Sequence, residues 1–260
     1  MIGIIPAAGK GTRFKELGKQ YSKTILPYKE KPILVHQIEW LENQGCDEIR
    51  VVLNHQEDTV KEVLSFYNKN VTFKKQEEQN GLSGAIQCAL TTEDKDNVLI
   101  LLGDLIPNEN LWEDILEQDF ISVQEVPDYS RWCMVETKAG LCTKFLDKPS
   151  DKPETNLAVS GVYHILNSAK LYTLLNEQLS GLDTINGEYQ ISSVLQKIAN
   201  EYMLNTVNLD LIDFGTLEEY LKNRSVKISR SFNDIEVQDS FITKSSIIER
   251  EKIIKECNWF

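Results

Sequence analysis

The sequence predicts an α/β fold built on a mixed, mainly parallel sheet with flanking helices. Apolar runs of strand length alternate with stretches of helical apolar spacing along most of the chain. Residues 98–102 are five consecutive apolar residues, which is typical of a strand covered on both faces. The first apolar run, residues 2–6, leads directly into a loop of small residues. Together these observations predict right-handed βαβ units whose ligands bind at the carboxyl ends of the strands.

Each element follows from its own apolar pattern and from the residues that end it. The helix predicted for residues 33–41 has apolar side chains at helical spacing and stops near Gly45, and residues 49–53 read as a buried strand. Thr216 is a good N-cap for the helix that begins at Leu217. The expected strands are residues 2–6, 49–53, 71–73, 98–102, 120–126, 133–136, 143–146 and 159–165, and the expected helices are residues 33–41, 59–66, 82–90, 169–178, 191–200 and 217–222.

Composition and charge exclude several classes of protein. The chain of 260 residues is 41% hydrophobic and carries a net charge of −12, which argues against a disordered chain and against a nucleic-acid partner. Residues 1–31 nevertheless hold seven basic and two acidic residues. This basic island suggests a small anionic ligand such as a phosphate, although a lysine-rich surface loop would give the same count.

The chain lacks the sequence features of membrane and secreted proteins. No apolar run reaches the roughly 18 residues that a spanning helix needs, and the first six residues are too short and uncharged for a signal peptide. The five cysteines are odd in number and none form a CxxC pair, which favours reduced thiols. We therefore expect a cytoplasmic protein with no membrane span.

The loop after the first strand has the composition of a phosphate site. Residues 6–14 read PAAGKGTRF, and small residues let consecutive backbone N–H groups wrap an anion. The spacing is not that of a Walker A loop, because five residues separate Gly3 from Gly9. It is not GxGxxG either, since Phe14 stands where the third glycine belongs.

Three charged residues complete the candidate site. Lys23 follows Arg13 by ten residues, so the two cations could clamp one polyphosphate, although Lys23 also fits a surface loop. Asp104 follows the buried strand at residues 98–102 and could hold Mg²⁺, or it could cap a turn. Asp213 follows another apolar run. The triplet Asp213-Phe214-Gly215 does not indicate a kinase, because the other kinase motifs are absent from the sequence.

In this order, the motifs resemble those of the nucleotidyltransferase superfamily that activates sugar phosphates and phosphocholine. Residues 7–13 and 22–27 are similar to its phosphate-binding signature, and Gln76 with residues 81–85 to its nucleobase loop. Gly103-Asp104 resembles its metal-bearing pair. Further matches are Arg131-Trp132 and residues 147–149, 161–163, 187–192 and 211–220, so the similarity covers residues 1 to about 224.

The resemblance implies a Rossmann-like fold of the nucleotide-diphospho-sugar transferase type. It also implies an enzyme that condenses a nucleoside triphosphate with a phosphorylated small molecule and releases pyrophosphate. Arg13 would take the pyrophosphate, Lys23 the α-phosphate and Lys148 the attacking phosphate, while Mg²⁺ would bind Asp104 and Asp213. The implied nucleotide-binding residues are Ala7, Ala8, Gly9, Gly11, Gln76, Gly81 and Ser83, and the implied substrate-binding residues are Arg131, Gly161 and Glu188.

Three departures from the superfamily pattern bear on the substrate. Ser22 stands where proline is usual, Asp147 replaces the glutamate of E-K-P, and Leu211 replaces a tryptophan. Sugar-1-phosphate enzymes usually keep the residues that differ here, whereas the IIPAAGKGTRF start resembles that of the cytidylyltransferases of non-sugar phosphates. CTP and phosphoglutamine, in capsule biosynthesis, are therefore our first expectation. The alternatives are sugar-1-phosphate uridylyl- or thymidylyltransferase and choline-phosphate cytidylyltransferase. Methylerythritol cytidylyltransferase shares only the first loop, and an inactive nucleotide-binding subunit would not need all of these charged residues.

The end of the chain carries no motif of the superfamily. We expect residues 1–224 to form the nucleotidyltransferase domain and residues 225–260 to form an arm. The arm contains many apolar residues, whose exposure to water costs about 25 cal/mol per Å². It is therefore expected to pack on the domain or on the partner subunit of a possible homodimer.

Overall fold

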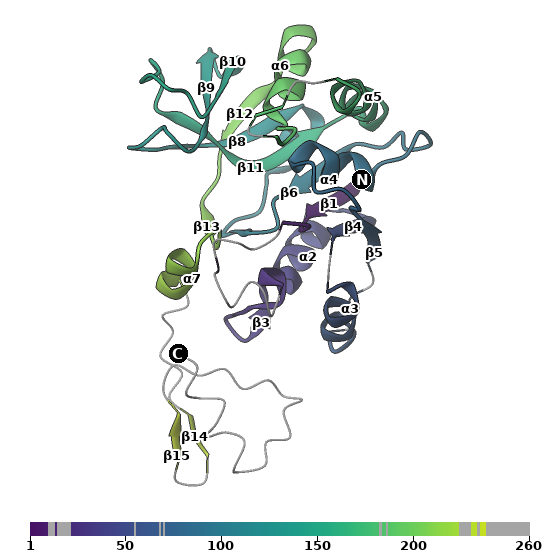
Figure 1. Cartoon of the computed structure of the whole chain (residues 1–260), viewed down its shortest axis with the longest axis vertical. Helices are drawn as coiled ribbons and strands as arrows, with labels where there is room; N and C mark the ends of the chain where they lie inside the picture. The colour runs from purple at the N-terminus through teal and green to yellow at the C-terminus, as the bar shows by residue number, and fades with distance from the viewer. Residues whose placement is uncertain are drawn as a thin grey trace.

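The computed structural model describes residues 1–9, 14, 22–54, 56–67, 69, 71–181, 184–185 and 187–223, and the backbone of 230–232 and 235–237. The main body of this described part is a nine-stranded sheet in the order β5-β4-β1-β6-β11-β8-β12-β10-β9, with helices on both faces (Figure 1). The predicted α/β class with a mixed sheet is confirmed. None of the helices in these ranges combines the length and apolar character needed to cross a bilayer.

The first half of the sheet is parallel. It consists of β1 (Ile2–Pro6), β4 (Glu48–Leu53), β5 (Thr72–Lys75) and β6 (Val98–Leu101). The apolar runs of β1, β4 and β6 are buried on both faces, as expected for parallel strands under helices, whereas the edge strand β5 has no buried residue. The connecting helices are α2 (Ile33–Asn43), α3 (Glu57–Ser65) and α4 (Leu82–Ala89).

The second half of the sheet is largely antiparallel. It contains β8 (Phe120–Glu125), β9 (Cys133–Lys138), β10 (Leu141–Asp147), β11 (Leu157–Ile165) and β12 (Asn205–Asn208), of which only the β12–β8 pair is parallel. The remaining helices are α5 (Ser168–Leu179), α6 (Ser192–Glu201) and α7 (Leu217–Asn223). The sequence analysis did not predict β12, because Asn205–Asn208 lacks an apolar run.

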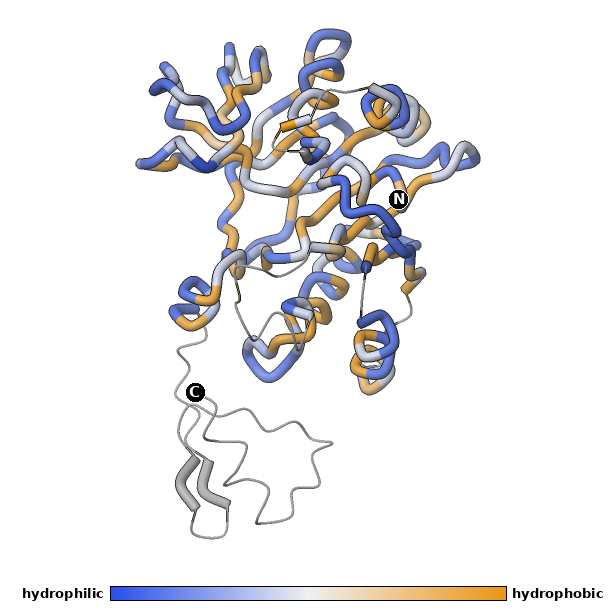
Figure 2. The backbone as a smooth tube through the Cα atoms, in the orientation of Figure 1, coloured by the Kyte–Doolittle hydropathy of each residue, from blue (hydrophilic) through white to orange (hydrophobic). Residues whose placement is uncertain are grey.

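Two hydrophobic cores lie on opposite faces of the sheet. Helices α4, α5 and α6 pack on one face and α2 and α3 on the other, so that neighbouring residues of β1 point to different cores: Ile4 to the first and Ile5 to the second. Figure 2 shows the resulting pattern, with apolar strands in the middle and polar segments at the outer surfaces of the helices. Because both faces of the sheet are buried under helices, the central strands are held in place by packing.

A small two-stranded sheet joins distant parts of the chain. Strand β7 (Leu105–Pro107) pairs antiparallel with β13 (Leu211–Asp213), with Asp213 opposite Leu105. Beyond it, a third core packs Phe14 and Tyr28 with Phe214 and Tyr220. In Figure 1, β13 leads down from the main body to α7, which lies to the left of α2. Because of this pairing, the two predicted metal ligands belong to neighbouring segments.

Other short elements complete the description. They are the 3₁₀ turns η2 (Lys23–Ile25) and η3 (Glu113–Glu117), the hairpin of β2 (Pro27–Tyr28) and β3 (Lys31–Pro32), and the hairpin of β14 (Arg230–Phe232) and β15 (Ile235–Val237). The domain boundary at residue 224 and the packing of the arm stay predictions, since most of residues 224–260 lie outside the described residues. The cysteines within the described ranges, Cys46, Cys88, Cys133 and Cys142, form no disulfide there.

Arg50, on β4, is the centre of an ion-pair network in the parallel half of the sheet. Its guanidinium donates two hydrogen bonds to the Asp94 carboxylate, at 2.6 and 2.8 Å, and a third to the carbonyl of Ala89. The Arg50 and Asp94 side chains are only 8% and 9% exposed, and Arg50 also binds Glu48. These hydrogen bonds from Arg50 hold the pKa of Asp94 below its usual value.

We expect the stability that Asp94 contributes to depend on pH. Because its pKa is lowered in the folded protein, the contribution is fully present above the unfolded pKa, about 3.9, and is lost as the pH falls through the folded value. Urea titrations of wild type and Asp94→Asn should give a difference in unfolding free energy that is constant near neutral pH and shrinks below about pH 4. A difference that persists unchanged in acid would contradict this assignment.

Candidate active site

One cavity of about 460 Å³ is lined by most of the predicted charged groups within the described residues. Its lining includes Asp104 and Asp213 from the β7–β13 region and Arg131 and Lys148 from the ends of β9 and β10. Tyr163 of β11 contributes a buried aromatic ring. The cavity therefore lies where the two halves of the sheet meet, next to the carboxyl end of β6.

Asp104 lies in a tight turn directly after β6. The turn is closed by a hydrogen bond from Leu105 N to Leu102 O, and the carbonyl of Asp104 accepts one from Phe214 N at 2.8 Å. A Cβ atom on Gly103 would lie 2.9 Å from Pro6 O and 3.1 Å from Ala7 Cα. Glycine is therefore required for the Asp104 turn to approach the loop that follows β1 this closely.

Lys23 forms an ion pair with Asp104. The Lys23 Nζ atom donates to Asp104 Oδ2 at 2.6 Å, and the two side chains are 19% and 27% exposed. The sequence analysis assigned these residues separately, to a phosphate and to a metal, and their contact is a finding of the structure. Lys23 is thus positioned beside the carboxylate that would hold a cation.

Asp213 approaches the same place from β13. Its Oδ1 accepts a hydrogen bond from Gly215 N at 2.6 Å. A Cβ atom on Gly215 would lie 2.9 Å from Asp213 Oδ1 and 3.5 Å from Asp104 Oδ2, so both carboxylates border the space beside this glycine. Burial, with a contribution from the negative charges of Asp104 and Glu219, raises the pKa of Asp213 to about 6.

This pair of carboxylates fits the Mg²⁺ that the resemblance implies. Mg²⁺ prefers oxygen ligands and is commonly bound through one or two carboxylates, with water and substrate phosphates as its other ligands. The nearby Glu219 carboxylate is engaged by the N–H and hydroxyl of Thr216, as in a capping box. Within the described part of the chain there is no cluster of three or more His, Cys, Asp or Glu side chains arranged around a metal position.

Lys148 and Arg131 form the cationic part of the lining. Lys148 has a positive φ of 47°, which is uncommon outside glycine, and its N–H donates to the Trp132 carbonyl at 2.9 Å. Such strained residues cluster at binding sites, where the surrounding structure holds them in place. The guanidinium of Arg131 lies over the Trp132 ring, 5.9 Å from its centroid. Two cations beside one cavity favour an anionic ligand.

Asp147 and Ser192 are also part of the lining. Asp147 Oδ2 accepts a hydrogen bond from Ser192 Oγ at 2.9 Å, at the start of α6. The sequence analysis did not select Ser192 or Tyr163, although both belong to the motifs it quoted. Strand alternation gives no usable signal for Tyr163, because the register of β11 against β8 shifts between Val159 and Tyr163.

The predicted nucleobase residues form a compact loop next to the cavity. Gln76 is buried and its Nε2 donates to Asn80 Oδ1 and to the carbonyl of Gly81. Gly81 has a φ of 105°, and a Cβ atom there would lie 2.6 Å from Tyr189 O. Ser83 is fully buried, and its Oγ has no hydrogen-bond partner among the described residues. Of this loop, the cavity lining includes Leu82 but not Gln76, Gly81 or Ser83.

The remaining candidates are distributed around the same region. Ala7, Ala8 and Gly9 follow β1, and the Ala8 carbonyl accepts a hydrogen bond from Gln79 of the nucleobase loop at 3.0 Å. Gly161 has a φ of 111°, and a Cβ atom there would lie 2.5 Å from Leu105 Cδ1, so it admits the Asp104 turn against β11. Glu188 is exposed and accepts a hydrogen bond from Gln190. The predictions for Gly11 and Arg13 lie outside the described residues.

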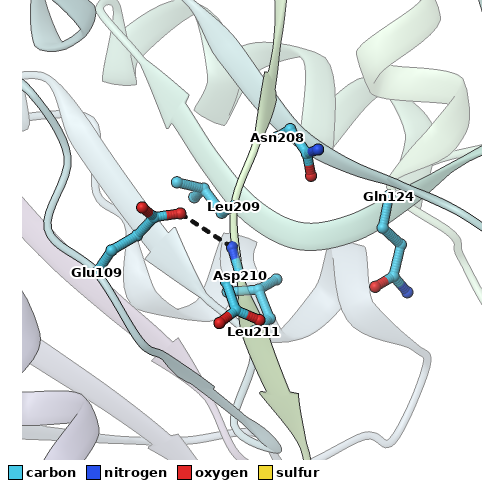
Figure 3. Close-up of a pocket in the computed structure, with 6 residues that line it drawn as sticks. All are labelled: Glu109, Gln124, Asn208, Leu209, Asp210 and Leu211. Carbon is cyan, nitrogen blue, oxygen red and sulfur yellow. Dashed lines mark hydrogen bonds between the residues drawn. The ribbon is translucent and has the colours of Figure 1, made fainter.

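A second cavity, of about 400 Å³, adjoins the first. Figure 3 shows its lining, in which Asp210 N donates to Glu109 Oε1 at 3.1 Å. Gln124 and Leu211 line both cavities. It is lined by Glu109, Gln124, Asn208, Leu209, Asp210 and Leu211, of which the sequence analysis noted only Leu211, as a departure from the superfamily pattern.

Comparison with known families agrees with this geometry. The nucleotidyl transferase family matches residues 2–228, which include all the residues that line the cavity. The chain therefore belongs to the nucleotidyl transferase family.

Characterised relatives include sugar-phosphate nucleotidyltransferases. UTP–glucose-1-phosphate uridylyltransferase AglF of Haloferax volcanii is 30% identical over 84% of this chain and 93% of its own length. Low-salt glycan biosynthesis nucleotidyltransferase Agl11 of the same organism is 29% identical, over 77% of this chain and 58% of Agl11. The bifunctional protein GlmU of Methanocaldococcus jannaschii is 25% identical, over 98% of this chain and 61% of GlmU. The chain thus spans about three fifths of the length of Agl11 and GlmU.

Solved structures share the fold. Apo UDP-glucose pyrophosphorylase superposes with a TM-score of 0.71 at 20% identity, covering 86% of this chain and 96% of that one. A putative glucose-1-phosphate thymidylyltransferase from Bacillus anthracis gives a TM-score of 0.73 at 20% identity, covering 89% and 97%. At this identity the likeness establishes the α/β architecture, in agreement with the predicted nucleotide-diphospho-sugar transferase type.

Proposed function

We propose that the protein transfers a nucleotidyl group from a nucleoside triphosphate to a sugar 1-phosphate, with release of pyrophosphate. The observation that carries the proposal is a single cavity whose lining places the carboxylates of Asp104 and Asp213 near two cations, Arg131 and Lys148; Asp147 and Glu219, which also line it, are hydrogen-bonded to Ser192 and Thr216. A reaction between two phosphates needs cationic side chains that bind the attacking anion. It also needs carboxylates that bind a metal, which offsets the charge of the triphosphate. The names of the relatives support a sugar phosphate as the acceptor.

In this mechanism the protein positions the reactants and neutralises charge. Lys148 and Arg131 hold the acceptor phosphate, one oxygen of which attacks the α-phosphorus of the triphosphate. The bond to the pyrophosphate oxygen breaks, and pyrophosphate leaves with the electron pair. No general base is required, because a phosphate monoester dianion is a nucleophile at neutral pH. Lys23 stabilises the charge of the five-coordinate state, and the resemblance assigns the leaving pyrophosphate to Arg13.

Mg²⁺ bound by Asp104 and Asp213 would supply charge screening between the two anions. Loading it requires an ionised Asp213, whose pKa of about 6 leaves the carboxylate charged at neutral pH. Lys23 contacts the Asp104 carboxylate at 2.6 Å, so the ammonium already compensates part of the negative charge at this position.

A second candidate is cytidylyl transfer to a non-sugar phosphate such as phosphoglutamine. It is favoured by Asp147, which is shorter than the glutamate usual at this position and is held by Ser192. The shorter side chain changes the part of the cavity that the acceptor would occupy. The relatives favour a uridylyl or thymidylyl donor instead, so this candidate ranks second.

Turnover with defined substrate pairs tests the proposal. Pyrophosphate release is measured with UTP, dTTP, CTP and GTP, each combined with glucose 1-phosphate, phosphoglutamine or phosphocholine. The first candidate predicts the fastest release with UTP or dTTP and the sugar phosphate. Preference for CTP with phosphoglutamine would establish the second candidate, and no release with any pair would contradict both.

Asp213→Asn is expected to impair the metal dependence of this reaction. An amide has nearly the shape of the carboxylate but binds Mg²⁺ weakly, so the fold should persist. Loss of a residue that only hydrogen-bonds to a metal ligand typically weakens metal binding about 10–100-fold. Loss of a ligand itself should raise the Mg²⁺ concentration for half-maximal pyrophosphate release by at least this factor. Asp210→Asn, on the same segment but outside this cavity, is the matched control. An unchanged Mg²⁺ requirement in Asp213→Asn would remove this residue from the metal site.

A further inference from the structure

Gln37 lies beneath the turn that carries Asp104. It is on α2, is completely buried, and its Nε2 donates to the carbonyl of Leu102 at 2.9 Å and to that of Leu105 at 2.8 Å. These two residues are the first and last of the Asp104 turn. Both hydrogens of the side-chain amide are therefore used to hold the two ends of the turn that carries a proposed metal ligand.

Packing alone does not account for a glutamine at this position. The rest of the buried face of α2 is apolar, with Leu34, Ile38 and Leu41 fully buried. Gln37 Oε1 is also buried and finds no hydrogen-bond partner in the part of the chain that the structure describes. A buried, unpaired acceptor costs about 1–3 kcal/mol, and a methionine of similar size would avoid this cost. The stabilising contribution of Gln37 thus resides in its two donated hydrogen bonds.

The geometry of Asp104 depends on the Leu102–Leu105 turn. Its carbonyl contacts Phe214 N and its carboxylate contacts Lys23, so a shift of the turn moves Asp104 relative to both. Asp213 lies one residue before Phe214, on the strand paired with Leu105. Loss of the Gln37 hydrogen bonds would therefore change the distance between the two carboxylates that border Gly215.

We propose that Gln37 is a positioning residue for Asp104 and thereby sets the affinity of the two-carboxylate site for a divalent cation. It touches neither substrate nor metal and acts through the backbone of the turn. The role of Gln37 in catalysis rests on the proposed function. Its effect on cation affinity is a property of the protein alone and can be measured without substrate.

The test compares two glutamine-to-methionine variants, one within α2 and one at its C-cap. Gln37→Met removes both donors at nearly constant volume. Gln44→Met is the matched control, because Gln44 is also buried and binds the 110–111 segment through Asn110 Oδ1 and Leu111 N, away from the cavity lining. Binding of Mn²⁺ is measured without substrate by electron paramagnetic resonance, alongside the thermal midpoint and steady-state kinetics.

We expect Gln37→Met to weaken Mn²⁺ binding by about 10–100-fold, the range typical of residues that orient metal ligands. Its kcat should fall at subsaturating Mg²⁺ and partly recover at high Mg²⁺, while the KM for the acceptor phosphate is unchanged. Gln44→Met should lower the thermal midpoint without affecting Mn²⁺ affinity.

Two results would overturn the proposal. One is wild-type Mn²⁺ affinity in a folded Gln37→Met variant, and the other is an equal loss of affinity in both variants, which would indicate general destabilisation. If Gln37→Met does not fold, Gln37→Glu, which keeps the shape of the side chain, is measured with the same criteria. A wild type that binds Mn²⁺ but releases no pyrophosphate would refute the proposed function and leave the Gln37 test intact.

Discussion

Lys23→Ala is expected to reduce kcat by about 10² to 10³ while changing the affinity for the triphosphate far less. Lys23 comes from a 3₁₀ turn whose position is fixed by burial of Thr24, and its ammonium already lies 2.6 Å from Asp104. A preorganised cation stabilises charge that develops in the transition state more than charge present in the ground state. Because Lys23 would stabilise the transition state more than the bound triphosphate, its loss should lower kcat more than it weakens triphosphate binding.

The measurement is pyrophosphate release at saturating substrates, together with triphosphate binding by calorimetry. Lys31→Ala is the matched control, since Lys31 is close in sequence but pairs with Glu39 and does not line the cavity. It should retain wild-type kcat. A Lys23→Ala enzyme with wild-type kcat, or one that loses binding and turnover in equal measure, would show that Lys23 has no specific role in the transition state.

Arg50→Met is expected to lower the free energy of unfolding by about 3–5 kcal/mol. Removal of the guanidinium leaves the nearly buried Asp94 carboxylate without its main partner and the Ala89 carbonyl without a donor. The cost arises from uncompensated burial of charge rather than from the attraction between the two ions. Arg50 is not part of the cavity lining, so the effect should appear in stability and not in KM.

Urea titration at pH 7 measures this loss. The double variant Arg50→Met with Asp94→Leu should recover part of it, because no unpaired buried charge remains at Asp94. Lys144→Met is the control for loss of an ion pair at the surface, where the Lys144–Glu136 pair should contribute only about 0–1 kcal/mol. Equal losses in Arg50→Met and Lys144→Met would contradict the assignment of Arg50 as a buried anchor.

The sequence predicted the parallel half of the fold well, and the reason is local. Helices cover both faces of the sheet at Ile2–Pro6 and Val98–Leu101, so nearly every residue of these strands is apolar. An uninterrupted apolar run of this length can be recognised in the sequence alone. Asp104 could be proposed as a site residue because it ends such a run. The exact element ends were off by a few residues, since helix and strand termini depend on caps and pairing.

The arrangement of the site was less predictable, because it depends on contacts between distant segments. Strands β7 and β13 have three residues each, too short to show a period, and only their pairing places Asp213 beside Asp104. The Lys23–Asp104 contact likewise has no local signature. Gln37 was overlooked because a single polar residue on an apolar helix face does not reveal what it binds.

The position of Asp213 in the chain has a consequence for how the protein is made. Asp104 emerges from the ribosome early, but β13 follows only after β8 to β12 and α6 have been synthesised. Closing so long a loop is entropically unfavourable until the intervening strands have paired, so the β7–β13 ladder should be among the last contacts to form. A nascent chain would therefore contain the loop after β1 and Asp104 well before Asp213 can lie beside them. On the proposed function, cation binding and turnover would begin only after the C-terminal half has folded.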